Sequence, residues 1–204
     1  MTVYDLKPRF QALLRPITRA MAARGITANQ VTLAAVALSV VAGGLLALYP
    51  THALALLLIP LILLLRMALN AIDGMLAREH GQQSRLGAIL NELGDVVSDI
   101  ALYLPFALIP GVSATLVVLL VLAAAVVEMT GVVAVQIGAS RRYDGPLGKS
   151  DRAVLFGGLA LLFGLGLSAG DWTTIVLAIA LAMSLLTVVK RARNALREVD
   201  AHAA

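Results

Sequence analysis

Cysteine is absent from this chain of 204 residues, and charged residues are scarce, at 14% of the total. The absence of cysteine excludes disulfides and thiolate chemistry, so the compartment has to be inferred from topology. Soluble domains contain about 25% charged and about 45–50% apolar residues on average. Here 60% of the residues are hydrophobic. Composition therefore argues against an ordinary soluble domain and predicts an integral membrane protein.

The few charges that are present give a formal net charge of +4. A basic chain can bind nucleic acid, but in a chain this apolar the charge is better explained by Lys and Arg facing anionic lipid headgroups. We therefore predict the lipid bilayer, and no nucleic acid, as the partner of these residues. Residues 1–25 are polar and basic, unlike a secretory signal.

Six apolar stretches are long enough to cross a bilayer, which takes about 20 residues for a helix. They are Ala28–Leu48, Ala53–Ala77, Leu86–Ile109, Ala114–Ala139, Ala153–Ser168 and Trp172–Lys190. An apolar stripe at helical spacing precedes them, made of Phe10, Leu13, Leu14, Ile17 and Met21. Such a stripe is typical of a helix lying in the headgroup layer, the alternative being a disordered basic tail.

The predicted fold is thus an all-α integral membrane protein with six transmembrane helices and an N-terminal interfacial amphipathic helix. We divide it into a juxtamembrane segment (1–26), a six-helix domain (27–190) and a C-terminal tail (191–204). Of the 16 Lys and Arg residues, all but Arg66 fall on one side of the predicted spans. Because cytoplasmic loops are enriched in Lys and Arg, both termini are predicted to be cytoplasmic.

Polar residues interrupt the second and third spans at helical spacing. Asn70 and Asp73 lie at i and i+3 in one span, and Asn91, Asp95 and Asp99 lie at i, i+4 and i+8 in the next. Each set therefore lies on one helix face. Because ionisable residues are expensive in a bilayer, such clusters indicate a functional site.

An antiparallel hairpin of these two spans places Asn70 at the depth of Asp95 and Asp73 at that of Asn91. Carboxylate and amide oxygens converging from two helices can hold a hard cation such as Mg²⁺. A metal held there would bind a diphosphate and stabilise charge during phosphoryl transfer. Arg78, one turn beyond Asp73, can pair with phosphate.

The same hairpin places Arg66 at the depth of Asp99, and we interpret these two as a buried ion pair rather than catalytic groups. Glu128, in the fourth span, is either a second partner of Arg66 or a polar residue facing the bundle, and receives no chemical role. Paired membrane carboxylates can also carry protons or ions. Nothing ionisable continues toward the outer ends of the spans, which argues against a transporter or channel.

These residues resemble the CDP-alcohol phosphatidyltransferases, whose motif is Asp-x2-Asp-Gly-x2-Ala-Arg-x8-Gly-x3-Asp-x3-Asp. The corresponding segment here is Asn70-x2-Asp73-Gly74-x2-Ala77-Arg78-x8-Gly87-x3-Asn91-x3-Asp95. Six of the eight positions match, with every spacing intact, and the chain is most similar to the bacterial YnbA-type members of the family. The resemblance implies transfer of a phosphatidyl or related phosphoalcohol group from a CDP-linked lipid, with CDP-diacylglycerol as the favoured donor. A small alcohol accepts it and CMP is released, in phospholipid biosynthesis.

The resemblance also implies residue roles. Asp73 and Asp95 would ligate Mg²⁺ or Mn²⁺, and Asp95 would be the base that deprotonates the acceptor. Two motif aspartates are Asn70 and Asn91 here, whose amide oxygens can still ligate a metal but bring no negative charge. The alternative is therefore a catalytically impaired member that binds CDP-lipid or supports a partner enzyme.

Donor contacts carried over from the family fall on Asn29, Gln30, Val31, Thr32, Gly74, Ala77, Arg78, Ser84 and Gly87. Basic residues between the fourth and fifth spans are candidates for binding the acceptor, namely Arg141, Arg142, Lys149 and Arg152. They are equally what a cytoplasmic loop requires. The resemblance further implies a homodimer in the bacterial inner membrane, with the active site on the cytoplasmic side.

Overall fold

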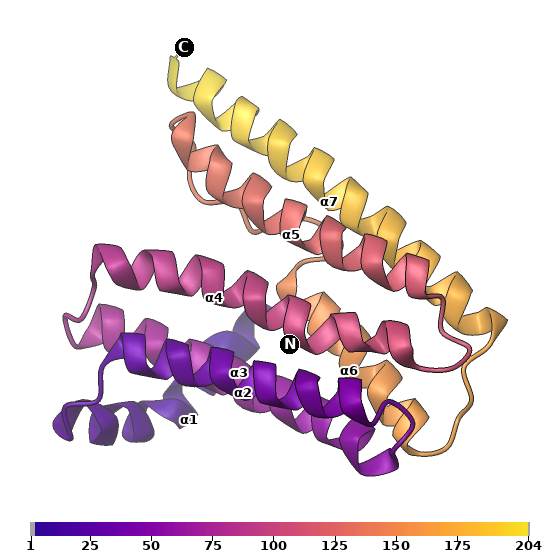
Figure 1. Cartoon of the computed structure of the whole chain (residues 1–204). Coiled ribbons are helices and arrows are strands. Elements are labelled where there is room, and N and C mark those ends of the chain that lie inside the picture. The colour runs from indigo at the N-terminus through magenta and orange to yellow at the C-terminus, as the bar shows by residue number, and fades with distance from the viewer. Residues whose placement is uncertain (1–2, 204) are drawn as a thin grey trace.

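The computed structural model describes the backbone of residues 3–203 and the side chains of residues 10–202. This range is helical and contains no strand, which confirms the all-α prediction for it (Figure 1). Its elements, in chain order, are α1 (Val3–Ala23), α2 (Ala28–Leu48), α3 (Ala53–Glu79), α4 (Arg85–Tyr103), the 3-10 helix η1 (Leu104–Leu108), α5 (Ala114–Gln136), α6 (Lys149–Gly164) and α7 (Asp171–Ala203).

The helices form two groups. Helix α2 packs against α3 and α4, and α3 also packs against α1 and α6. Helices α5 and α7 run side by side as a second group, with α5 touching α4 and η1 (Figure 1). An apolar core joins the two groups, and at its centre Tyr103 stacks on Phe156 with ring centroids 4.2 Å apart.

Four helices are long and apolar enough to cross a membrane, namely α2, α3, α5 and the Asp171–His202 part of α7. Helix α4 carries three acidic residues within its 19 residues. Helix α6 has 16 residues, fewer than the about 20 that a span takes. The prediction of membrane-spanning helices is confirmed, whereas the count of six spans remains a prediction for α4 and α6.

Two helix boundaries differ from the predicted spans for local reasons. Helix α4 ends at Tyr103 and gives way to η1, because Pro105 lacks the N–H that the interior of an α-helix needs. Helix α6 begins at Lys149, earlier than predicted, because the side chain of Asp151 accepts a hydrogen bond from the backbone N–H of Gly148 (2.8 Å). That bond caps the first turn.

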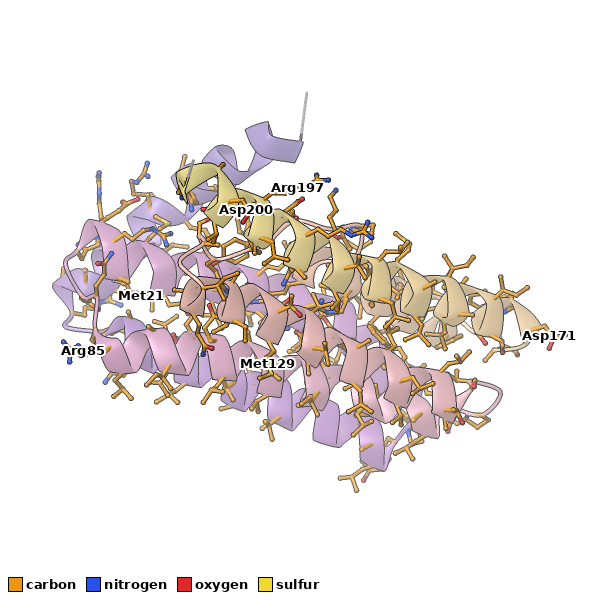
Figure 2. The ribbon with its side chains drawn as sticks, turned by 90° about the horizontal axis from the view of Figure 1, so that it is seen from above. Met21, Arg85, Met129, Asp171, Arg197 and Asp200 are labelled. Carbon is orange, nitrogen blue, oxygen red and sulfur yellow. The ribbon has the colours of Figure 1, made fainter. Side chains whose placement is uncertain are left out.

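Helix α7 continues to Ala203, well past the predicted end of the last span at Lys190. The extension is held by packing, because Ala195 is buried against Ala134 and Ala139. In Figure 2, Arg85 and Met21 lie at one end of the molecule and Asp171 at the other.

Helix α1 uses its apolar stripe in two directions. Leu14 is buried in a cluster shared with α2 and α3, and Phe10 and Met21 pack against that cluster. Leu13 and Ile17 remain 73% and 51% exposed. The helix itself is thus present, and its position in the headgroup layer remains a prediction that these two exposed side chains suit.

Helices α2 and α4 are in close contact at Gly43, where an added Cβ would overlap the carbonyl oxygen of Ala101. We expect Gly43→Ala to destabilise the fold by about 1–3 kcal/mol, because backbone has to move to admit the methyl group. The measurement is the melting temperature of the purified protein in detergent. Gly44→Ala is the matched control, since a Cβ there meets nothing within 4 Å. Equal losses in the two variants would contradict this close packing.

Candidate active site

Asp73 is held between α2 and α3. Its side chain is buried, and its Oδ2 accepts a hydrogen bond from Oγ1 of Thr32 (2.8 Å). The hydroxyl fixes the orientation of the carboxylate and leaves Oδ1 directed elsewhere. No side-chain hydrogen bond joins Asp73 to Asn91 among the described residues, so their equal depth stays a prediction.

Asp95, on α4, receives several donors on one oxygen. Nδ2 of Asn70 lies 3.3 Å from its Oδ1, Nζ of Lys149 lies 2.5 Å from it, and Nη2 of Arg66 lies 3.5 Å from it. Within the described part of the chain, no hydrogen bond to Oδ2 is found. The predicted meeting of Asn70 and Asp95 is confirmed, and one carboxylate oxygen is left available.

A chain of buried ion pairs lies next to Asp95. Nη1 of Arg66 donates to Oδ1 of Asp99 (2.6 Å), which confirms the predicted pair. Oδ2 of the same carboxylate accepts from Nη2 of Arg152 (2.9 Å). Arg152 also donates to Oε1 of Glu128 (3.0 Å) and is fully buried. These contacts tie α3, α4, α5 and α6 together.

Glu128 is the centre of this network. Besides Arg152, its carboxylate accepts from Nη2 of Arg141 (3.0 Å) and lies 3.4 Å from Nη1 of Arg191. Of the two interpretations of Glu128, the bundle-facing one is confirmed, since its ionic partners among the described residues do not include Arg66. Sequence reasoning missed Arg191, which looked like one more basic residue at the end of a span.

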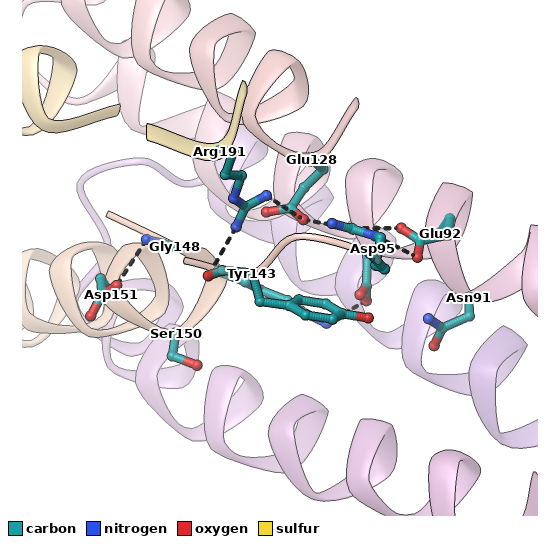
Figure 3. Close-up of a pocket in the computed structure, with 11 residues that line it drawn as sticks. Asn91, Glu92, Asp95, Glu128, Tyr143, Gly148, Ser150, Asp151 and Arg191 are labelled. Atoms are coloured by element: carbon teal, nitrogen blue, oxygen red, sulfur yellow. Dashed lines mark hydrogen bonds and ion pairs between the residues drawn. The ribbon is translucent and has the colours of Figure 1, made fainter. Parts of the chain in front are cut away.

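A cavity of about 270 Å³ borders this network of ion pairs. It is lined by Asn91, Glu92, Asp95, Glu128, Arg141, Tyr143, Gly148, Lys149, Ser150, Asp151 and Arg191. Figure 3 shows Asn91, Glu92 and Asp95 on one side of it and Gly148, Ser150 and Asp151 on the other. The α4 face predicted from the sequence thus lies across the cavity from the first turn of α6.

The predicted acceptor residues separate into two pairs. Arg141 and Lys149 line the cavity. Arg142 instead pairs with Asp144 (2.9 Å) and Glu198 (2.7 Å), and Arg152 lies in the buried network. Two of the four basic residues therefore line the cavity, where both are paired with carboxylates, and the other two form ion pairs away from it.

Arg141 is fixed by a two-pronged contact with Glu92, at 3.0 and 2.8 Å. Burial by itself lowers the pKa of the Arg141 guanidinium, but its hydrogen bonds to Glu92 and Glu128 outweigh this and raise the pKa. The side chain therefore stays charged throughout the physiological pH range. Two-pronged pairs of this kind also fix orientation, so Arg141 presents a fixed charge to the cavity.

The predicted donor residues gather around the start of α2 and the first turns of α4. An added Cβ at Gly87 would lie 2.8 Å from Oδ1 of Asn29 and 3.0 Å from Oγ of Ser84, so the absence of a side chain there lets α2 approach α4. Gly74 is likewise covered by Arg78, whose Nη2 would lie 2.9 Å from an added Cβ. On the predicted donor side, these glycines thus let the polar side chains of Arg78 and Asn29 lie close to the helix backbone.

Several of these residues have structural partners. The Gln30 side chain accepts from the backbone N–H of Thr27 (2.9 Å) and helps cap α2, and Ser84 caps α4 by accepting from Gly87 N–H (2.9 Å). Val31 is buried. Gln82, which sequence reasoning did not single out, accepts from the backbone N–H of Ala28 (2.7 Å). It ties the loop between α3 and α4 to the start of α2.

The motif contains two carboxylates that could bind a metal ion, those of Asp73 and Asp95. Across the described residues, no group of three His, Cys, Asp or Glu side chains is placed to hold a metal ion. The reason is that Asn70 and Asn91 occupy two motif positions that carry aspartate in the family pattern. Amide oxygens are accepted ligands of hard cations, so Asp73, Asp95 and an amide oxygen make a donor set that fits Mg²⁺ or Mn²⁺.

The sequence of this chain is similar to those of known proteins. The family model for CDP-alcohol phosphatidyltransferases matches residues 25–191. The chain is 47% identical to the inner membrane protein YnbA of Escherichia coli (strain K12) over 196 residues, which cover 96% of this chain and 97% of that protein. With its four long apolar helices, the chain is an integral membrane protein.

Solved structures share the fold. Phosphatidylinositol phosphate synthase (PgsA1) of Mycobacterium tuberculosis with CDP-DAG bound has a TM-score of 0.72 to this chain, at 20% identity, covering 90% of this chain and 92% of that one. The same enzyme in complex with manganese and citrate has a TM-score of 0.71 at 20% identity, covering 89% and 88%. At this identity the likeness concerns the fold.

Proposed function

The chain belongs to the CDP-alcohol phosphatidyltransferase family, and on that premise we propose that it is an active member using CDP-diacylglycerol as donor. The acceptor oxygen attacks the phosphorus of the phosphatidyl group, and the bond from that phosphorus to the bridging diphosphate oxygen breaks. CMP leaves with the electron pair, and the acceptor's proton passes to Asp95. The product is a phospholipid whose headgroup is the acceptor.

One observation carries the proposal. Asp95 lines the cavity and has no hydrogen bond to Oδ2 from the described residues, while its Oδ1 is held by Asn70 and Lys149. A general base has to lie within hydrogen-bond reach of the proton that it removes. An acceptor hydroxyl in the cavity would meet this oxygen directly.

Asp73, Asp95 and the amide oxygen of Asn70 or Asn91 would hold the divalent cation. When bound, Mg²⁺ or Mn²⁺ supplies positive charge to the diphosphate of the donor. The manganese complex of the Mycobacterium tuberculosis enzyme supports this choice of ion. In this chain Thr32 orients Asp73.

The nucleotide end of the donor would lie at the last turns of α3 and the first turns of α4, beside the start of α2. We assign its contacts to Asn29–Thr32, to Gly74, Ala77 and Arg78, and to Ser84 and Gly87. The close approach of Arg78 to Gly74 and of Asn29 and Ser84 to Gly87 supports this assignment, as does the CDP-DAG complex of the Mycobacterium tuberculosis enzyme.

The acceptor is proposed to be a small uncharged alcohol that contacts Arg141 and Lys149. The three cations of the cavity are already paired, Arg141 with Glu92 and Glu128, Lys149 with Asp95, and Arg191 with Glu128. A phosphorylated acceptor would have to compete with these carboxylates, whereas hydroxyl groups can hydrogen-bond to both partners of each pair.

The experiment is CMP release from CDP-diacylglycerol by purified protein, with Mg²⁺ or Mn²⁺ and matched acceptors such as glycerol against glycerol 3-phosphate and inositol against inositol phosphate. We expect a higher kcat/KM for the uncharged member of each pair and loss of release with EDTA. Higher kcat/KM for the phosphorylated members would refute the acceptor assignment.

The second candidate is a non-catalytic protein that binds CDP-lipid or supports a partner enzyme. It is favoured by one observation, that Asn70 and Asn91 leave only two carboxylates in the motif. The same assay separates the two candidates, because a binding protein would retain CDP-diacylglycerol without releasing CMP under any acceptor or metal condition.

A further inference from the structure

Lys149 occupies an unusual place for a lysine in a site that is to hold a divalent cation. Its ammonium lies 2.5 Å from Oδ1 of Asp95, the oxygen that also accepts from Asn70. The lysine side chain is 32% exposed and lines the cavity. A fixed positive charge is therefore present at the carboxylate before any metal arrives.

The start of α6 fixes the backbone that carries this lysine. Lys149 is the first residue of the helix, and the cap between Asp151 and Gly148 N–H holds its first turn. Three residues further on, Arg152 is anchored by Asp99 and Glu128. The lysine thus projects from a fixed helix start into the site.

The number of carboxylates in the motif limits how much positive charge the site can hold. Asp73 and Asp95 contribute two negative charges, and the amides of Asn70 and Asn91 contribute none. One divalent cation balances the two carboxylates, and the ammonium of Lys149 leaves the site with a single excess positive charge. A second divalent cation would raise that excess to three. Coulomb repulsion between cations a few ångströms apart therefore disfavours a second divalent ion next to the ammonium.

We propose that the site binds one divalent cation, and that the ammonium of Lys149 is the second positive charge, built into the protein. Asp73, Asp95 and an amide oxygen would hold the metal. The ammonium stays on Oδ1 and faces the cavity, next to the oxygen that accepts the proton. This inference rests on the proposed function, because it assigns the charges of that same site.

The test is a titration of the purified full chain with Mn²⁺ in detergent, with CDP present, in which EPR measures the free ion. We expect one Mn²⁺ per chain in the wild type. Lys149→Met should still bind one, with a Kd lowered about tenfold or more because the repelling charge is gone. Lys190→Met, an exposed lysine without an ion pair in the described residues, should leave the Kd unchanged.

Adding carboxylates provides the second arm. The combined variant with Asn70→Asp, Asn91→Asp and Lys149→Met should bind two Mn²⁺ ions per chain. Two ions in the wild type, no ion in the wild type, or an unchanged Kd in Lys149→Met would each overturn the inference.

The titration also distinguishes this inference from the proposed function. One bound Mn²⁺ without CMP release would leave the charge assignment standing and refute the transferase. CMP release with two bound ions would do the reverse.

Discussion

Replacing Asp95 by asparagine is expected to lower metal-dependent CMP release about 10³-fold or more. A general base contributes about 10²–10⁴ in rate, and the same change removes one of the two carboxylates available to the metal. Asparagine keeps the shape of the side chain and can still contact Asn70 and Lys149, so the loss would reflect charge and basicity. The measurement is kcat for CMP release at saturating donor.

The control for this variant is Asp200→Asn, which makes the same chemical change on an exposed aspartate near the end of α7 (Figure 2). It should retain wild-type activity. If Asp95→Asn kept more than about a tenth of wild-type kcat, less than the smallest loss expected on removing a general base, Asp95 would not be the base.

Replacing Glu128 by alanine is expected to destabilise the fold by about 3–5 kcal/mol. Its carboxylate is the shared partner of Arg141, Arg152 and Arg191, and Arg152 is fully buried. Removing one member of a buried ion pair leaves a charge without compensation, which costs more than the pair contributes. The free energy of unfolding, measured by denaturant titration in detergent, tests this expectation.

The matched control is Glu79→Ala, because Glu79 forms an ion pair with Arg15 in which both side chains are more than a third exposed. Exposed pairs are worth about 0–1 kcal/mol, so this variant should unfold nearly like the wild type. Similar losses from Glu79→Ala and Glu128→Ala would mean that the buried network does not hold the bundle together.

Helical periodicity was sufficient to predict the polar face of the candidate site. The i, i+4 and i+8 spacing put Asp95 and Asp99 on one side of α4, and the short connection to α3 set their depth against Asn70 and Arg66. Both contacts are present. Such predictions succeed because a helix and a tight hairpin leave little freedom in register.

The other contacts of the candidate site could not be predicted from helical periodicity. Arg152 and Arg191 are far from α4 in sequence, and only the packing of α6 against α3 and of α7 against α5 brings them to Glu128. Charge alone marked these arginines as cytoplasmic, because sequence does not say which basic residues face lipid and which face a buried carboxylate. The role of Gln82 in joining two loops was hidden for the same reason.

The extent of α7 illustrates a similar limit. Hydropathy ended the last span at Lys190, because the residues that follow are charged. The helix continues since Ala195 finds a small-residue contact with Ala134 and Ala139, and tertiary packing overrides the local pattern of charge. The position of Arg191 at the cavity depends on this continuation.

The most direct test of the transferase assignment is product analysis of a single reaction. Wild-type protein is incubated with CDP-diacylglycerol, Mg²⁺ or Mn²⁺ and the best acceptor, and CMP and lipids are quantified by mass spectrometry. If the protein is a transferase, we expect CMP and one new phospholipid in equal amounts, with the acceptor as headgroup. Retention of intact CDP-diacylglycerol on the protein, with no CMP formed with any acceptor, would contradict it.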